Sequence, residues 1–295
     1  MGPASPSITS RTIHSVRNFA LFSGAGVAIV CALVLLGWIL DIGLLKSAIP
    51  GYPDMKANTA ICLGLLAMGV VALSRGNARW QWILLLAGPA AAIATLTLVQ
   101  YVTKTDFGLD QSLFTDAAST GRYPGRMSPL AALAIVSLAI ALCLQIRDRQ
   151  FHSMQQAAAL LPFILGLLGT TGLIYRFQFL AGMGLGVAAT MAVNTAVAIM
   201  LLALSILALN PDAGILRVVL ANRSGGRFAR RMLPAAILFP ITMGWLQMLG
   251  QDAGYYDSQF GILIMVLSYV ASMGGSKPTT TITGNSASCA KSPPG

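Results

Sequence analysis

Two asparagine–threonine pairs are the side chains of this sequence whose type and spacing could most readily do chemistry together. Asn58 and Thr59 lie in the hexapeptide "MKANTA", and Asn194 and Thr195 lie in the nearly identical "MAVNTA". Both side-chain types donate and accept hydrogen bonds without ionising. The pairs therefore predict polar contacts between closely packed helices, which we favour, or a polar pocket that the two copies share.

Chemistry that needs ionised groups is not expected inside the apolar segments. No Asp, Lys, Arg or His lies well within any of them, which argues against a proton-coupled pump and a retinal protein. The histidines, His14 and His152, fall outside the apolar runs, so a haem held by two histidines in the bilayer is not expected. The four cysteines form no Cys-x-x-Cys pair, and the glycine motifs of phosphate sites and nucleophile elbows are missing. We therefore expect no catalytic residue, metal or cofactor, and the ligand is unknown.

The composition places these residues in an integral membrane protein. Hydrophobic residues make up 56% of the 295 positions and charged residues only 9%, whereas soluble domains carry about 25% charged residues. A net charge of +10 would suit a nucleic-acid partner in a soluble protein. In a membrane protein it reflects basic cytoplasmic loops instead, so we expect a lipid bilayer and no nucleic acid.

The apolar runs predict an all-α fold, a polytopic membrane helix bundle of about eight spans. A bilayer requires about 20 apolar residues for each span. We expect spans at 18–40, 57–74, 80–102, 128–146, 157–174, 185–209, 233–249 and 259–273. This gives a cytoplasmic segment at 1–17, a membrane domain at 18–273 and a disordered Ser/Thr/Gly/Pro-rich tail at 274–295.

Charged residues divide unevenly between the two sides of this map. Thirteen of the nineteen Lys and Arg residues fall on the side of the two termini, whereas seven of the nine acidic residues fall on the other side. Basic residues accumulate in cytoplasmic loops. The distribution therefore predicts that both termini are cytoplasmic and that an even number of spans lies between them.

The hexapeptides mark an internal repeat. "MKANTA", the weaker "MSPLAA" and "MAVNTA" begin at Met55, Met127 and Met191, with spacings of 72 and 64 residues. Each opens a predicted span that enters the membrane from the external side. A repeat of this length predicts stacked two-helix hairpins in one orientation. The predicted fourth hairpin lacks the motif.

Several blocks of the sequence resemble a known class of membrane region. They are "LLGWILDIGLLKSAIPGYPDMKANTAICLGLLAMGVVAL", "DFGLDQSLF…PGRMSPLAALAIVSLAIAL", "MAVNTAVAIMLLALSILAL" and "SGGRFARRMLPAAILFPITMGWLQMLGQDAGYYDSQFGILIMVLS". Together they are similar to the multi-pass N-terminal sensory region of bacterial sensor histidine kinases and of some diguanylate cyclase signalling proteins. The likeness covers residues 25–270.

The resemblance implies a signal-sensing module in the bacterial inner membrane that biases a cytoplasmic kinase or cyclase, with a homodimer formed through the bundle. The sequence departs from that pattern after the last predicted span, where no kinase or cyclase motif follows. We therefore expect a non-catalytic module that lacks its output domain. The alternative is a permease-like transporter or channel for a neutral substrate, which would not need charges in its spans.

Overall fold

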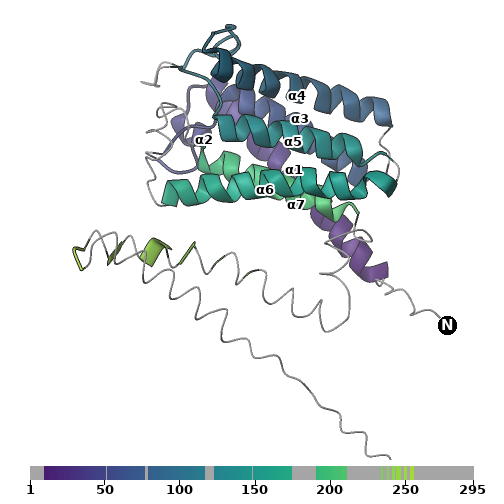
Figure 1. The fold of residues 1–295 in the computed structure, drawn as a ribbon. Coiled ribbons are helices and arrows are strands. Elements are labelled where there is room, and N and C mark those ends of the chain that lie inside the picture. Colours follow the sequence, from purple (N-terminus) through teal and green to yellow (C-terminus); the bar gives the residue numbers. More distant parts are fainter. Residues whose placement is uncertain are drawn as a thin grey trace, which may run out of the picture. The chain divides into compact units, whose positions relative to one another are not determined.

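The computed structural model describes residues 10–50, 52–76, 79–116, 123–147, 149–174 and 191–210, and scattered positions from 234 to 255. Within these residues all regular secondary structure is helical, which confirms the predicted all-α class for this part of the chain (Figure 1). The chain divides into two compact units, Met1–Ile237 and Leu238–Gly295.

The described part of the first unit contains seven α-helices and one 3₁₀ helix. They are α1 (Ser10–Ile39), α2 (Gly43–Lys46), α3 (Ala57–Ser74), α4 (Trp80–Thr103), α5 (Pro129–Leu144), η1 (Arg149–Phe151), α6 (His152–Ile174) and α7 (Val193–Ala208). Four of them, α1, α3, α4 and α6, are long and apolar enough to cross a membrane. The chain is therefore a helical membrane protein.

The apolar runs located these four helices well. α3 has the predicted bounds and α4 exceeds its predicted span by one residue, whereas α1 and α6 begin eight and five residues earlier than predicted. His14 and His152 consequently lie within the starts of α1 and α6, because both helices begin before their apolar runs. Both histidines lie outside the apolar runs, as expected, but inside the helices that contain these runs.

Two other helices are shorter than the spans predicted for them. α5 and α7 contain 16 residues each, or about 24 Å at 1.5 Å per residue, against a hydrocarbon core of roughly 30 Å. The start of the predicted span 185–209 lies outside the described residues, as does all of 259–273. The span 233–249 is described only at isolated positions, which are helical.

The six longer helices form three antiparallel hairpins, α1/α3, α4/α5 and α6/α7. They pack in a closed ring in the order α1, α3, α4, α5, α6, α7, and α7 returns to α1. In addition, α3, α5 and α7 each contact the other two. The second helix of every hairpin is therefore an inner helix, and the first helix is an outer one. Figure 1 shows these helices side by side, with α2 at one end of the bundle.

Burial differs between the inner and the outer helices, and this difference explains why two inner helices can be short. The protein buries 56% of the apolar window of α3, but only 28% to 33% of those of α1, α4 and α6. A helix that faces lipid must satisfy its backbone along the full apolar thickness, whereas irregular backbone is tolerated where protein covers it. Because α5 and α7 lie among other helices, they can end before they cross the whole core.

Small residues allow the close approach of the inner helices. A methyl group at Gly69 of α3 would lie 2.6 Å from Cδ2 of Leu142 on α5. A methyl group at Gly166 of α6 would lie 2.7 Å from Cγ of Met200 on α7. Both distances are too short for a real contact, so glycine is needed for this close approach, and close packing of this kind holds helices together in lipid.

The second unit is described at a few positions only. Thr242 donates a hydrogen bond to the Leu238 carbonyl at 3.0 Å, four residues earlier in a helix. The Ala253 amide donates to the Leu249 carbonyl at 3.0 Å, and Gly254 then adopts a left-handed conformation with φ of 73°. A helix therefore ends here in a glycine turn, as helices commonly do.

Candidate functional site

The three hexapeptides form the same local structure. Met55, Met127 and Met191 are each at most 2% exposed. The residue after each methionine is the helix N-cap, with φ from −70° to −64° and ψ from 147° to 149°, and the helix begins at the next position. The repeat read in the sequence is thus a repeated junction. We call the end of the bundle where these methionines lie the motif end.

An aromatic side chain at the end of an outer helix binds the methionine that precedes its inner partner. Trp38, in the last turn of α1, donates from Nε1 to the Met55 carbonyl at 2.9 Å. Tyr101, in the last turn of α4, donates from its hydroxyl to the Met127 carbonyl at 3.1 Å. Both bonds close a hairpin at the motif end. Tyr175, which precedes Met191 in the sequence, lies outside the described residues.

The two asparagines bind backbone in the loops of neighbouring hairpins. Asn58 donates from Nδ2 to the Leu109 carbonyl in the α4–α5 loop at 2.8 Å. Asn194 donates from Nδ2 to the Lys46 carbonyl at the end of α2 at 3.3 Å. The asparagines therefore reach different partners and hold each inner helix to a loop of another hairpin.

The threonines that follow the asparagines are also buried. Thr59 is 2% exposed and Thr195 is 3% exposed. The Thr195 amide lies 3.2 Å from Oδ1 of Asn194, so this asparagine uses both ends of its amide group. Asn58 and both threonines are thus buried at the motif end, whereas Asn194 is partly buried.

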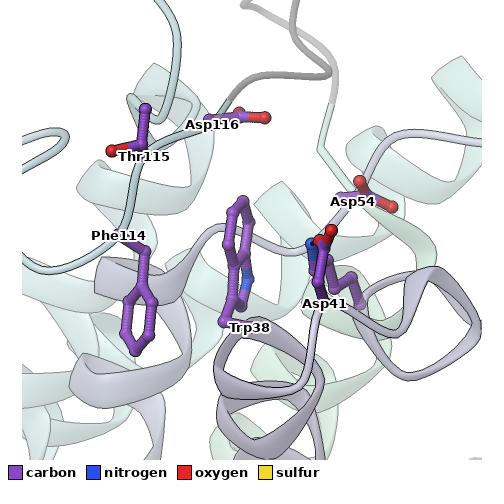
Figure 2. A pocket seen from close by; sticks show the side chains of 7 residues that line it. Trp38, Asp41, Asp54, Phe114, Thr115 and Asp116 are labelled. Atoms are coloured by element: carbon purple, nitrogen blue, oxygen red, sulfur yellow. Dashed lines mark hydrogen bonds and ion pairs between the residues drawn. The ribbon is translucent and has the colours of Figure 1, made fainter.

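A pocket of about 290 Å³ opens at the motif end, beside the first hairpin. It is lined by Trp38, Asp41, Lys46, Asp54, Phe114, Thr115 and Asp116. Figure 2 shows the Trp38 ring standing between Phe114 on one side and Asp41 and Asp54 on the other. The lining therefore comes from the α1–α3 connection and the α4–α5 loop. We call it the Trp38 pocket.

Lys46 lines the Trp38 pocket and connects it to neighbouring elements through its side chain and its backbone carbonyl. Its side chain is 11% exposed, and its Nζ lies 2.5 Å from Oδ1 of Asp41 and 4.4 Å from the centroid of the Trp38 ring. The Lys46 hydrogen bond lowers the pKa of the Asp41 carboxyl below its usual value of 3.8. The Lys46 carbonyl accepts hydrogen bonds from the Met55 amide at 3.0 Å and from Asn194. One residue therefore joins the pocket to the starts of α3 and α7.

The far wall of the pocket is an ion pair between hairpins. Lys56, the N-cap residue of α3, lies 2.5 Å from Oδ2 of Asp116, whose side chain is 3% exposed. The same oxygen accepts a hydrogen bond from the Gly125 amide at 3.1 Å. Gly125 has φ of 76°, and a Cβ there would lie 2.5 Å from the Asp110 carbonyl oxygen, so glycine is required. The ion pair and the Gly125 turn therefore hold this wall of the pocket in place.

A second polar cluster at the motif end surrounds Arg126, whose side chain is fully buried. Its Nε lies 2.6 Å from Oδ2 of Asp110, and its guanidinium lies 4.1 Å from the Tyr123 ring and 5.4 Å from the Tyr101 ring. Burial raises the pKa of the Asp110 carboxyl, although Arg126 opposes this shift. Gln100, also buried, donates toward Asp110 at 3.3 Å. This cluster fixes the α4–α5 loop.

Sequence reasoning missed the residues that make both clusters. It named none of Trp38, Tyr101, Lys46 and Arg126 as a candidate site residue. The available indication was position, because each aromatic residue lies in the last turn before a loop that ends in a motif methionine. The geometry shows specific hydrogen bonds at these places.

No family model, curated protein or solved structure matches the chain. The resemblance to sensory regions of signalling proteins therefore stays a prediction from the sequence blocks.

Proposed function

We propose that this chain is a membrane-embedded, non-catalytic signal-sensing module of a bacterial two-component or cyclic-dinucleotide signalling protein. One observation carries the proposal. The Trp38 pocket is joined by the Lys46 backbone to the Met55 amide and to Asn194, at the first residues of two inner helices. A ligand that changes the position of Lys46 changes the contacts of α3 and α7 directly.

The mechanism is a shift between two packings of the bundle. A ligand shifts such an equilibrium only by its difference in affinity for the two states. The Lys46 carbonyl supplies that difference, because it holds two inner helices in one packing through hydrogen bonds at 3.0 Å and 3.3 Å. The inner helices contact one another, so a displacement of one is passed to the others. The last span then carries the change to a cytoplasmic output domain.

The proposed topology has eight spans in the bacterial plasma membrane, with both termini in the cytoplasm. The charge distribution supports it, because thirteen of the nineteen Lys and Arg residues fall on the side that this topology assigns to the two termini. At the end opposite the motif end, Arg17 donates to the Ser74 carbonyl at 2.5 Å. Topology is tested with reporter fusions. Those after residues 79, 149 and 231 are expected to be cytoplasmic, and those near 116 and 252 external. The mirrored pattern would overturn the orientation.

The sensory function is tested by fusing a histidine kinase core after residue 273. We expect Asn194→Leu, which removes the bond to the Lys46 carbonyl, to change kinase autophosphorylation, since it alters the packing that the module reports. Val197→Leu is the control, because Val197 lies on the same helix and is 42% exposed. Equal activity of both variants and the parent would contradict the sensory function. We propose that the fusion is a homodimer through the bundle, which cross-linking in membranes tests.

A transporter for a neutral substrate is the competing function. It requires a path across the bilayer lined by uncharged polar side chains, because the described parts of the inner helices α3, α5 and α7 carry no charged residue. Flux of a neutral solute into liposomes that is blocked by Asn58→Leu or Asn194→Leu would support transport. It would also rule out a purely sensory role.

A further inference from the structure

We propose that the Trp38 pocket is a binding site for a small organic ammonium group, whose place is taken by the Lys46 side chain in this structure. The ammonium group belongs to a free solute or to the ethanolamine headgroup of a lipid, since both present the same chemistry at the membrane surface. The signalling consequence of binding rests on the proposed function, whereas the binding itself does not.

The charges in and beside the pocket favour a cation. Three carboxylates, Asp41, Asp54 and Asp116, line the pocket, and two ammonium groups, Lys46 and Lys56, neutralise part of their charge. Asp116 is committed to Lys56, because that ion pair is buried and holds the α4–α5 loop. Lys46 pairs with Asp41, and Asp54 lines the same pocket without an ion pair in the described residues. An additional cation restores the balance, whereas an anion worsens it.

The aromatic residues indicate an alkylated ammonium and not a bare metal ion. Lys46 Nζ lies 4.4 Å from the centroid of the Trp38 ring, within the distance of about 6 Å at which an aromatic face attracts a cation. Phe114 borders the same space, with its ring centroid 6.1 Å from that of Trp38 and an interplanar angle of 42°. Such apolar walls suit the carbon atoms around an ammonium nitrogen, whereas a hard divalent ion requires several oxygen ligands.

Lys46 shows that the position accepts an ammonium ion, and it is also the group that a ligand would displace. Its partner Asp41 is 92% exposed at the side chain, so the ion pair can open toward water without leaving a buried carboxylate unpaired. A volume of about 290 Å³ is at the lower limit for ligand pockets, which fits a small molecule. The carbonyl of the same residue accepts hydrogen bonds from the Met55 amide and from Asn194, beside the starts of α3 and α7.

The test uses the full chain in nanodiscs of phosphatidylglycerol, which has no amine headgroup, and radiolabelled choline in equilibrium dialysis. We expect saturable binding of choline, with its neutral isostere 3,3-dimethylbutan-1-ol at least about tenfold weaker as a competitor, the size of a cation–π contribution. Equal competition by the isostere, or no saturable binding, would overturn the site.

Two variants separate the internal cation from general charge effects. Lys46→Met removes only the competing ammonium group and keeps the backbone carbonyl, so we expect the affinity for choline to rise about tenfold. Lys104→Met removes the same charge from an exposed position at the same end and is expected to leave the affinity unchanged. Asp54→Asn is expected to lower the affinity. An unchanged affinity in a folded Lys46→Met protein would contradict the inference.

The two sources of the ammonium group are distinguished with nanodiscs that contain phosphatidylethanolamine. If the lipid headgroup occupies the pocket, the apparent affinity for choline falls in these discs, and Lys46→Met increases that competition. If the occupant is a free solute, the affinity is the same in both lipids. Choline binding without any effect on the kinase fusion would contradict the proposed function and leave the site intact. A fusion that responds to Asn194→Leu but binds no ammonium ion would contradict the ammonium site and leave the proposed function intact.

Discussion

The hydrogen bond between Tyr101 and Met127 offers a direct measure of how strongly the repeated junction holds a hairpin together. Tyr101→Phe removes only the hydroxyl that donates to the Met127 carbonyl at 3.1 Å and keeps the ring beside Arg126. A neutral hydrogen bond contributes about 0.5–1.5 kcal/mol to stability. Met127 is 1% exposed, so its carbonyl has little access to water when the hydroxyl is lost. We expect a loss of about 1 kcal/mol, roughly fivefold in the unfolding constant.

The assay is equilibrium unfolding with dodecyl sulfate in mixed micelles, followed by circular dichroism. Tyr52→Phe is the matched control, because the Tyr52 residue is 40% exposed and its substitution removes the same hydroxyl at the same end. Exposed substitutions of this kind change stability by less than about 0.5 kcal/mol. If both variants lose the same small amount, the bond to Met127 does not hold the hairpin, and the structural reading of the junction is refuted.

Three further predictions use the same unfolding assay. Gly37→Ala is expected to destabilise the protein by about 1–3 kcal/mol, because the new Cβ would lie 2.6 Å from Cβ of Leu45. In the control, Gly26→Ala on the same helix, the new Cβ meets nothing within 4 Å, and we expect a gain of about 0.5–1 kcal/mol. A Gly26→Ala protein that is less stable than Gly37→Ala would refute the placement of α2. Ser128→Ala removes the N-cap bond to the amide three residues on and is expected to cost about 1 kcal/mol, so an unchanged stability would contradict the cap. Burial raises the pKa of Asp110 above its usual 3.8, so the folded state binds the carboxyl proton more tightly than the unfolded state. The stability that this proton contributes is present below pH 3.8 and is lost as pH rises through the raised pKa. Asp110→Asn is expected to abolish this pH-dependent part of the stability, and the same dependence of stability on pH in the variant and the parent would refute the shift.

The helices themselves were predictable because they depend on local composition. Apolar runs gave the bounds of α3 and nearly those of α4, since charged and turn-forming residues such as Arg75 and Arg79 flank them. The run 128–146 likewise located α5 to within two residues. It did not reveal that α5 lies among other helices, because an apolar run has the same appearance whether it faces lipid or protein.

The candidate site was only partly predictable. The sequence singled out Asn58 and Asn194 as candidates for polar contacts between helices, and their hydrogen-bond partners are 51 and 148 positions away in the chain. No local pattern specifies that a lysine carbonyl in a four-residue helix accepts a bond from α7. The Trp38 pocket likewise joins the α1–α3 connection to the α4–α5 loop, and such long-range pairs are set by the hairpin packing.

The likeness of the hexapeptides reflects a common start of the three inner helices. Each start has a buried methionine followed by an extended N-cap residue. At the first two junctions an aromatic donor from the outer helix satisfies the methionine carbonyl. The two junctions differ in the residues that surround this aromatic donor.

At the second junction Tyr101 lies against Arg126, whose side chain is fully buried and hydrogen-bonded to Asp110, with the exposed Asp106 carboxylate 3.6 Å from the same guanidinium. At the first junction Trp38 lies against Lys46, which pairs with the exposed Asp41 and lines the Trp38 pocket. If the pocket binds the proposed ammonium ion, we therefore expect a ligand-dependent change to begin at the first hairpin, because its cation lines the pocket whereas Arg126 does not.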